Sequence, residues 1–505
     1  MSEKKEIIKD TLSYTVSNYI SRSIALIKNL VIAKLFSPAL FGVWKTLNLI
    51  LGYNDYSNMG FYEGMFREIP FKLSKGKDKE ANKIRNNALS IVTIITLLIS
   101  ILIFVLSFFF KQKYPNYVVT SIRLFALLVL FDQANTFLKF IFRIRKKFAL
   151  ASKVMIFMSI IDFILVVIFL LLKAQITGLL MALIITQIAT LVYAFSKSGE
   201  RKFKFELNRK ILLGLAKVGF FIMMTFFLWV IFRSIDQLMV MVFLGPEQMG
   251  YYSLAQGFSS WIYTIPSIFG LVISTYMFSK FGKRKKIQDI EQHLIQSTKI
   301  LAYLIPMIIG LSYVVIPVFI NYFLPDYIES VFIIKVLLLS TFFVSLMHAP
   351  TYYLIAINKQ AKLVRLGIVS LLVVALLDFI AIKQNLGIKG VAIATSLAYF
   401  VYITLLLSFA LNEQKCAFKK KFLFFVGVYF PFVYSCLILV VLDLLIGDFS
   451  NVLFNDIFLI TLKMIAFILL SLPLVIYINK KTKIIEHLFF IIRSKSSEIR
   501  AIFVK

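Results

Sequence analysis

The chain has 505 residues, of which 60% are hydrophobic and only 16% are charged. A water-soluble domain carries about 25% charged residues because its surface faces water, so this composition excludes a soluble globular protein. The formal net charge of +31 does not indicate nucleic-acid binding, since the cations gather in alternate loops, and we expect no nucleic acid among the partners.

The hydropathy pattern predicts an all-α polytopic membrane protein with about 14 transmembrane helices, because a helix needs roughly 20 apolar residues to cross the bilayer core. Residues 91-110 show no period-2 alternation, which favours helices over barrel strands. We interpret 211-244 as one long or kinked span, with thirteen spans as the alternative count. The predicted spans are 12-36, 41-62, 88-110, 118-142, 154-172, 177-196, 211-244, 251-277, 297-318, 328-350, 364-382, 390-410, 422-446 and 457-479.

Lysine and arginine residues indicate the topology. One alternate set of loops carries 40 of them and the other set carries 5. Because basic loops remain on the cytoplasmic side, we expect both termini in the cytoplasm of a multi-pass protein of the inner (cytoplasmic) membrane. The basic set comprises 1-11, 66-87, 143-153, 197-210, 279-296, 357-365, 412-421 and 480-505.

Two parts of the sequence repeat at an offset of 208 residues. LFSPALFGVW at 35-44 is echoed by FLGPEQMGYY at 243-252, which aligns two prolines and two glycines. Six predicted spans separate the copies, and this even number gives both copies the same orientation in the membrane. The pattern predicts two parallel-related six-helix lobes plus two C-terminal helices: a first lobe at 1-196, a basic cytoplasmic linker at 197-210, a second lobe at 211-410, transmembrane helices 13 and 14 within 411-480, and a basic cytoplasmic tail at 481-505.

Polar side chains recur at helical spacing in the spans that begin each lobe. The stripe in the second span has a counterpart in the eighth span under the same 208-residue shift. Two lobes with such faces would enclose a polar cavity near the midplane, as in transporters that alternate access by rocking. The predicted polar residues of the cavity are Asn18, Asn48, Asp55, Tyr56, Asp236, Gln256, Ser260 and Tyr263.

Charged residues inside spans need a reason, because an arginine, lysine or aspartate at a helix centre costs about 2.5–3.5 kcal/mol. No nearby acid in the sequence offsets the cations of the first two spans, although Asp55 could do so in space. Arg233 and Asp236 either form a neutralised i, i+3 pair that holds helices together or act as a switchable gate. We predict a cationic cavity that attracts a phosphate group, with substrate-binding residues Arg22, Lys28, Lys45 and Arg233.

Three stretches carry a family resemblance: LVIAKLFSPALFGVWKTLNLILGYNDYSNMGFYEGMFREIP at 30-70, IDQLMVMVFLGPEQMGYYSLAQGFSSWIYTIPSIFG at 235-270 and GIKGVAIATSLAYFVY at 387-402. They resemble the polysaccharide or O-antigen flippase (Wzx-type) branch of the multidrug/oligosaccharidyl-lipid/polysaccharide exporter superfamily. The resemblance implies a MATE-like exporter of fourteen helices. Such a protein moves an undecaprenyl-diphosphate-linked oligosaccharide from the cytoplasmic to the outer leaflet through a cationic central cavity.

The implied partners are a polyprenyl-diphosphate-linked glycan, the lipid bilayer and other polysaccharide assembly proteins. We expect no cofactor, metal site or catalytic residue, because no metal-ligand spacing, nucleophile constellation or Walker A pattern stands out. The alternatives are a cation-coupled multidrug exporter, a Lipid II flippase, and a membrane-embedded glycan polymerase or ligase, which would need a sizeable outer loop. Four aspartates within spans either bind a coupling proton or sodium ion or form structural pairs: Asp55, Asp162, Asp236 and Asp378.

Overall fold

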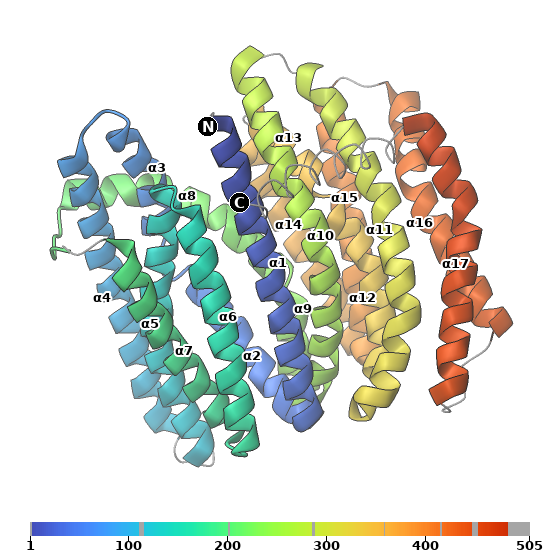
Figure 1. Ribbon diagram of the computed structural model, residues 1–505, viewed down its shortest axis with the longest axis horizontal. Coiled ribbons are helices and arrows are strands. Elements are labelled where there is room, and N and C mark those ends of the chain that lie inside the picture. The colour runs from blue at the N-terminus through green and yellow to red at the C-terminus, as the bar shows by residue number, and fades with distance from the viewer. Residues whose placement is uncertain are drawn as a thin grey trace, which may run out of the picture. The chain divides into compact units, whose positions relative to one another are not determined.

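The computed structural model describes residues 3-110, 116-199, 203-284, 288-357, 359-414, 417-446 and 453-482. Within these ranges every regular element is a helix and none is a strand (Figure 1). The prediction of an all-α protein is therefore confirmed. The predicted basic tail at 481-505 lies outside the described residues beyond Thr482.

The helices follow one another through short connections, and two of them begin at the prolines of the repeated motif. Proline suits the first turn of a helix because its missing amide hydrogen would have no intrahelical partner there. The elements are α1 (Glu3–Leu35), α2 (Pro38–Asn54), α3 (Phe61–Leu73), α4 (Asp78–Phe110), α5 (Asn116–Ile144), α6 (Phe148–Leu171), α7 (Gln175–Ser198), α8 (Arg209–Phe232), α9 (Ile235–Met239), the π-helical η1 (Val240–Leu244), α10 (Pro246–Arg284), α11 (Gln288–Phe323), the 3₁₀ turn η2 (Pro325–Tyr327), α12 (Ser330–Ser345), α13 (His348–Ala356), α14 (Gln360–Lys383), α15 (Gly387–Glu413), α16 (Phe418–Ile446) and α17 (Leu453–Thr482).

Eleven helical segments of the described chain are long and apolar enough to cross a membrane, and they coincide with eleven of the fourteen predicted spans. The other three predicted spans, 12-36, 41-62 and 251-277, are occupied by α1, α2 and α10. These three helices carry most of the predicted cavity residues.

The structure divides the predicted span 41-62, which sequence analysis treated as continuous. α2 ends at Asn54, a turn covers 55-60, and α3 begins at Phe61. Asn58 closes the turn, because its Nδ2 donates to the carbonyl oxygen of Asp55 and its Oδ1 accepts from the amide of Gly60 at 2.9 Å. Gly60 has a φ of 86°, which glycine adopts without strain. Side-chain bonds to the backbone thus replace helical bonds at this point.

The long span predicted at 211-244 is confirmed as a kinked one. α8 ends at Phe232, and the chain breaks at Arg233 and Ser234 before α9 and η1 continue to Leu244. The Ser234 hydroxyl donates to the carbonyl oxygen of Val230 at 2.7 Å, so it satisfies a backbone acceptor at the end of α8.

The chain folds as two compact units, each with its own core. The first unit consists of 1-257 and 371-388, and one buried cluster in it joins α3, α4 and α5 around residues such as Tyr62 and Phe137. The second unit consists of 258-370 and 389-505, with a cluster that joins α11, α16 and α17. The boundary at 257 falls inside α10, and the lobe boundaries inferred from the repeat stay a prediction.

Candidate functional site

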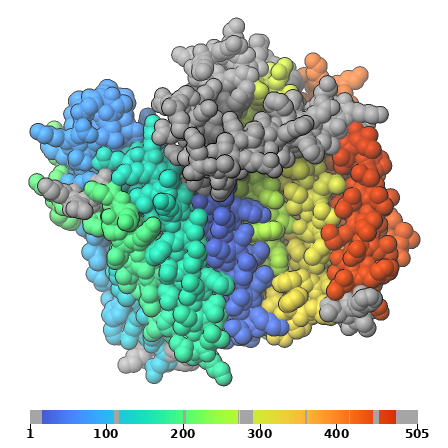
Figure 2. All heavy atoms as spheres, viewed as in Figure 1, coloured from blue at the N-terminus to red at the C-terminus, as the bar shows by residue number. Residues whose placement is uncertain are grey.

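α1 carries two of the predicted cavity cations and packs along α6 (Figure 2). Lys28 is buried, and its Nζ forms an ion pair with Oδ2 of Asp162 on α6 at 2.5 Å. The acid that offsets Lys28 is therefore Asp162 rather than Asp55, which the sequence had offered as a partner in space. Asp162 follows 134 residues later, so no local pattern links the two. Asp162 was interpreted either as a site for a coupling ion or as part of a structural pair, and the geometry shows the structural pair.

Arg22 lies on an exposed part of α1, where its Nε donates to Oδ1 of Asn18 at 3.0 Å. The two residues are four positions apart and share one face of the helix. This hydrogen bond orients the guanidinium and leaves it a cation, because the amide of Asn18 carries no charge. Arg22 and Asn18 therefore form part of a polar site on α1.

Lys45 on α2 is a partly buried cation without a compensating acid. Its Nζ lies 5.3 Å from the centre of the Phe41 ring, and it forms no hydrogen bond or ion pair with any residue that the structure describes. Lys28 is near enough to repel it electrostatically. Asn48, one turn further along α2, donates its Nδ2 to the carbonyl oxygen of Trp44 at 2.8 Å.

The turn after α2 meets the break after α8. The hydroxyl of Tyr53 and Oγ of Ser234 are 2.7 Å apart and share a hydrogen bond. The ring of Tyr56 packs against that of Phe227 with 5.3 Å between ring centres. Asp55 is exposed, and its Oδ1 accepts a hydrogen bond from a hydroxyl of α5 at 3.0 Å. Two interrupted helices therefore come together through aromatic and hydroxyl groups.

Arg233 caps the end of α8, and its guanidinium lies 6.0 Å from the centre of the Trp229 ring. Asp236 is buried and its Oδ2 accepts from the hydroxyl of Tyr252 on α10 at 2.6 Å. Gln256 donates its Nε2 to the carbonyl oxygen of Arg233 at 3.5 Å. Asp236 therefore ties α9 to α10, which supports a structural role for this acid.

Two of the remaining predicted residues, Ser260 and Tyr263, lie further along α10 in the second unit, whereas Gln256 lies just before the boundary, in the first unit. Gln256, Ser260 and Tyr263 share one face of this helix, because they are spaced by four and three residues. Tyr263 is buried and stacks on His348, with ring centres 5.5 Å apart and planes 21° apart. Ser260 is partly buried, and its carbonyl oxygen accepts from Thr264 at 3.2 Å.

A buried polar network beside the α2–α3 turn was missed by the site prediction. Asn54 and Gln187 donate to the two carboxylate oxygens of Asp132, each at 2.9 Å. Asn135 donates to Oε1 of Gln187 at 2.8 Å. The signal that could have found this network is the polar spacing in α5, where Asp132 and Asn135 are three residues apart within an apolar span.

The repeated motif brings its own two copies into contact. A Cβ added to Gly42 would lie 1.8 Å from the carbonyl oxygen of Pro246, and one added to Gly250 would lie 2.0 Å from that of Pro38. The contact is thus reciprocal, with each glycine facing the proline of the other copy. We call these four residues the Pro–Gly contact. Only glycine allows two membrane helices to approach this closely.

A second glycine contact joins α3 to α8. A Cβ on Gly219 would lie 1.8 Å from the carbonyl oxygen of Gly60 and 2.6 Å from the amide of Gly64. We call Gly60, Gly64 and Gly219 the glycine contact. Together, the two contacts hold α8 and the start of α10 against α2 and α3 by backbone packing. The described residues include no cluster of three or more side chains placed to hold a metal ion.

The fold and these polar membrane helices define a multi-pass helical membrane protein with a transporter fold. The fold resembles that of a Lipid II flippase, MurJ, in an inward closed conformation, with a TM-score of 0.70, 20% identity, and coverage of 92% of this chain and 99% of that one. An inward-facing multidrug resistance MATE family transporter of the MOP superfamily matches with a TM-score of 0.68, 13% identity, and 78% and 94% coverage. A MOP superfamily transporter from Pyrococcus furiosus matches with a TM-score of 0.59 and 13% identity. This match covers 80% of this chain and 95% of that one.

Residues 7-278 match the family described as polysaccharide biosynthesis protein. This match covers more than half of the sequence, and the chain therefore belongs to that family. The resemblance inferred from the sequence is confirmed at the level of the family and of the MATE-like fold. Comparison with curated protein sequences gave no significant match.

Proposed function

We propose that this protein is a flippase that moves a polyprenyl-diphosphate-linked oligosaccharide from the cytoplasmic to the outer leaflet of the cytoplasmic membrane. The observation that carries the proposal is Lys45, a partly buried membrane cation without an acid partner among the described residues. Such a cation costs about 2.5–3.5 kcal/mol in a span, and a bound phosphate would offset that cost. A member of a polysaccharide biosynthesis family has reason to bind a lipid-linked diphosphate.

The other predicted cations take different parts in this proposal. Arg22 and Arg233 are further ligands for the diphosphate, because guanidinium groups bind phosphate oxygens in pairs. Lys28 is paired with Asp162, so it does not offer the diphosphate a free charge. It contributes instead to the electrostatic potential around Lys45. In this proposal the cations accompany the diphosphate across while the prenyl chain stays in lipid, which avoids placing a bare anion in hydrocarbon.

The two glycine-rich contacts suit a transporter that alternates access. The atoms that meet at each contact are mainly backbone atoms. Such surfaces can separate with little loss of polar bonding, so opening costs mainly dispersion contacts. We place both termini in the cytoplasm, and the partners are the lipid-linked glycan, the bilayer and other polysaccharide assembly proteins.

The test is reconstitution of the purified chain into vesicles with a fluorescent polyprenyl-diphosphate sugar, whose outer-leaflet fraction is read by a membrane-impermeant quencher. Lys45→Gln should slow translocation by about 10- to 100-fold, the equivalent of one charge-assisted hydrogen bond. Lys45→Arg should retain most of the rate. Lys34→Gln is the matched control, since Lys34 is an exposed cation at the end of α1.

Equal rates for Lys45→Gln and Lys34→Gln would contradict the proposal. Labelled Lipid II and a cationic drug are offered in parallel, because these are the cargoes of the alternative functions. If either one moved faster than the polyprenyl-diphosphate sugar, it would replace that sugar as the proposed cargo, and the assignment of a transporter fold would not change.

A further inference from the structure

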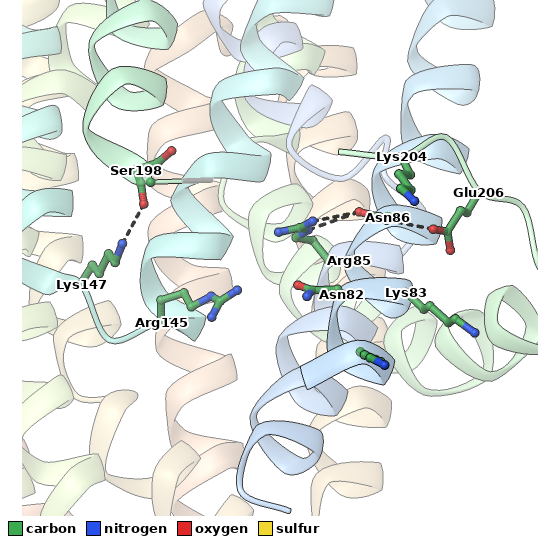
Figure 3. Close-up of a pocket in the computed structure, with 11 residues that line it drawn as sticks. Asn82, Lys83, Arg85, Asn86, Arg145, Lys147, Ser198, Lys204 and Glu206 are labelled. Carbon is green, nitrogen blue, oxygen red and sulfur yellow. Dashed lines mark hydrogen bonds between the residues drawn. The ribbon is translucent and has the colours of Figure 1, made fainter. Parts of the chain in front are cut away.

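A basic pocket lies at the end of the first unit that the charge pattern predicts to be cytoplasmic. It has a volume of about 750 Å³ and is formed by the start of α4, the α5–α6 turn, the end of α7 and residues 203-206 (Figure 3). Among the described residues, one carboxylate, that of Glu206, and six cations line it: Lys79, Lys83, Arg85, Arg145, Lys147 and Lys204. Six like charges around one cavity repel one another, so the pocket favours an anion.

Arg85 shows that the pocket contains a buried, fixed cation and is not only a chance cluster of surface lysines. Its side chain is only 7% exposed, and its Nη2 donates to Oδ1 of Asn86 at 3.1 Å. Its guanidinium also lies 4.7 Å from the centre of the Phe203 ring. Asn86 in turn donates to Oε1 of Glu206 at 3.1 Å (Figure 3). A buried guanidinium fixed in this way is already oriented for a phosphate group, at little entropic cost.

The wall at 203-206 is held in place by α4. The amide of Glu206 donates to Oγ of Ser90 at 3.0 Å, and the amide of Asn208 donates to Oδ1 of Asn87. On the opposite side, Nζ of Lys147 donates to the carbonyl oxygen of Ser198 at 2.7 Å. The part of the predicted basic linker that the structure describes from residue 203 onward is therefore packed against α4, and Lys204 and Glu206 line the pocket.

An apolar groove adjoins the basic pocket. It has a volume of about 520 Å³ and runs between α4, α5 and α7, with Leu138 and Leu191 among its lining residues. Phe203 lines this groove while its ring contacts Arg85 of the basic pocket, so the two cavities share a wall. Val192 and Phe195 at the groove are 65% and 41% exposed, which leaves its side open to the hydrocarbon of the membrane.

We infer that the pocket and groove together bind one anionic glycerophospholipid of the inner leaflet, with its phosphate among the cations and one acyl chain in the groove. If a methylene takes about the space of a water molecule, ~30 Å³, the groove holds roughly 17 methylenes, the length of one fatty acyl chain and far less than a polyprenyl tail. Basic pockets at the cytoplasmic ends of membrane helices bind such headgroups. The inference does not depend on the cargo of the transporter.

Native mass spectrometry of the full-length protein tests this site, with phosphatidylglycerol, phosphatidylcholine and soluble glycerol phosphate as probes. The variant Lys79→Gln/Lys83→Gln/Lys204→Gln removes three exposed cations of the pocket. Because each cation near an anionic headgroup is worth about fivefold in affinity, phosphatidylglycerol should bind on the order of 100-fold more weakly. The matched control is Lys75→Gln/Lys153→Gln/Lys197→Gln, three exposed lysines that do not line the pocket.

Val192→Trp tests the groove separately, because an indole there would occupy the entrance used by the acyl chain. It should weaken phosphatidylglycerol binding and leave glycerol phosphate binding unchanged. The inference is overturned if phosphatidylcholine binds the wild type as tightly as phosphatidylglycerol, or if both triple variants lose affinity equally. The inference is also overturned if glycerol phosphate binds as tightly as phosphatidylglycerol, or if a polyprenyl phosphate displaces phosphatidylglycerol from the site.

Discussion

Gly219 on α8 offers a sharp test of the packing between α3 and α8. In Gly219→Ala the new Cβ would lie 1.8 Å from the carbonyl oxygen of Gly60, whereas real Cβ contacts essentially never fall below 3.0 Å. The backbones must therefore separate by about 1.2 Å, the difference between these two distances. No rotamer change can relieve the clash, because its partners are backbone atoms. Overpacking of this kind costs about 1–3 kcal/mol.

Gly214→Ala is the matched control on the same helix. A Cβ at Gly214 meets nothing within 4 Å, so this substitution changes only helix propensity, which favours alanine by about 1 kcal/mol. Both variants gain that amount, and their difference in stability therefore isolates the contact with α3. Thermal unfolding of the purified proteins in detergent should show Gly214→Ala equal to or above the wild type and Gly219→Ala clearly below it. Equal midpoints for the two variants would refute the close approach of α3 and α8.

Two further predictions concern contacts that the sequence did not show. Asp162→Asn should destabilise the protein by about 3–5 kcal/mol because it leaves Lys28 buried without its acid, and adding Lys28→Met should recover much of the loss. Thermal unfolding of the two single variants and the double variant checks this, and additive losses would disprove the pair. Gly42→Ala should cost about 1–3 kcal/mol through the Pro–Gly contact, whereas Gly52→Ala, with open space around its Cβ, should not; similar unfolding midpoints would count against that contact.

Local sequence properties set the helices of this protein and several of their ends. Apolar runs of sufficient length predicted the eleven apolar spans, because a helix in lipid must satisfy its own backbone. Proline at 38 and 246 marked two helix starts. The α2–α3 turn was missed although its signal is also local: Asn54, Asn58 and Gly60 form a polar cluster with glycine, whose side-chain bonds compete with the helix.

Only the tertiary structure decided which residues are in contact with each other. The sequence showed no acid close to Lys28 along the chain, and packing of α1 along α6 supplied Asp162. The echo at 38 and 246 predicted two copies of one motif with the same orientation in the membrane, and the fold brought those copies into contact with each other. The physical reason is that hydropathy and helix propensity act over a few residues, whereas ion pairs and glycine contacts depend on how whole helices pack.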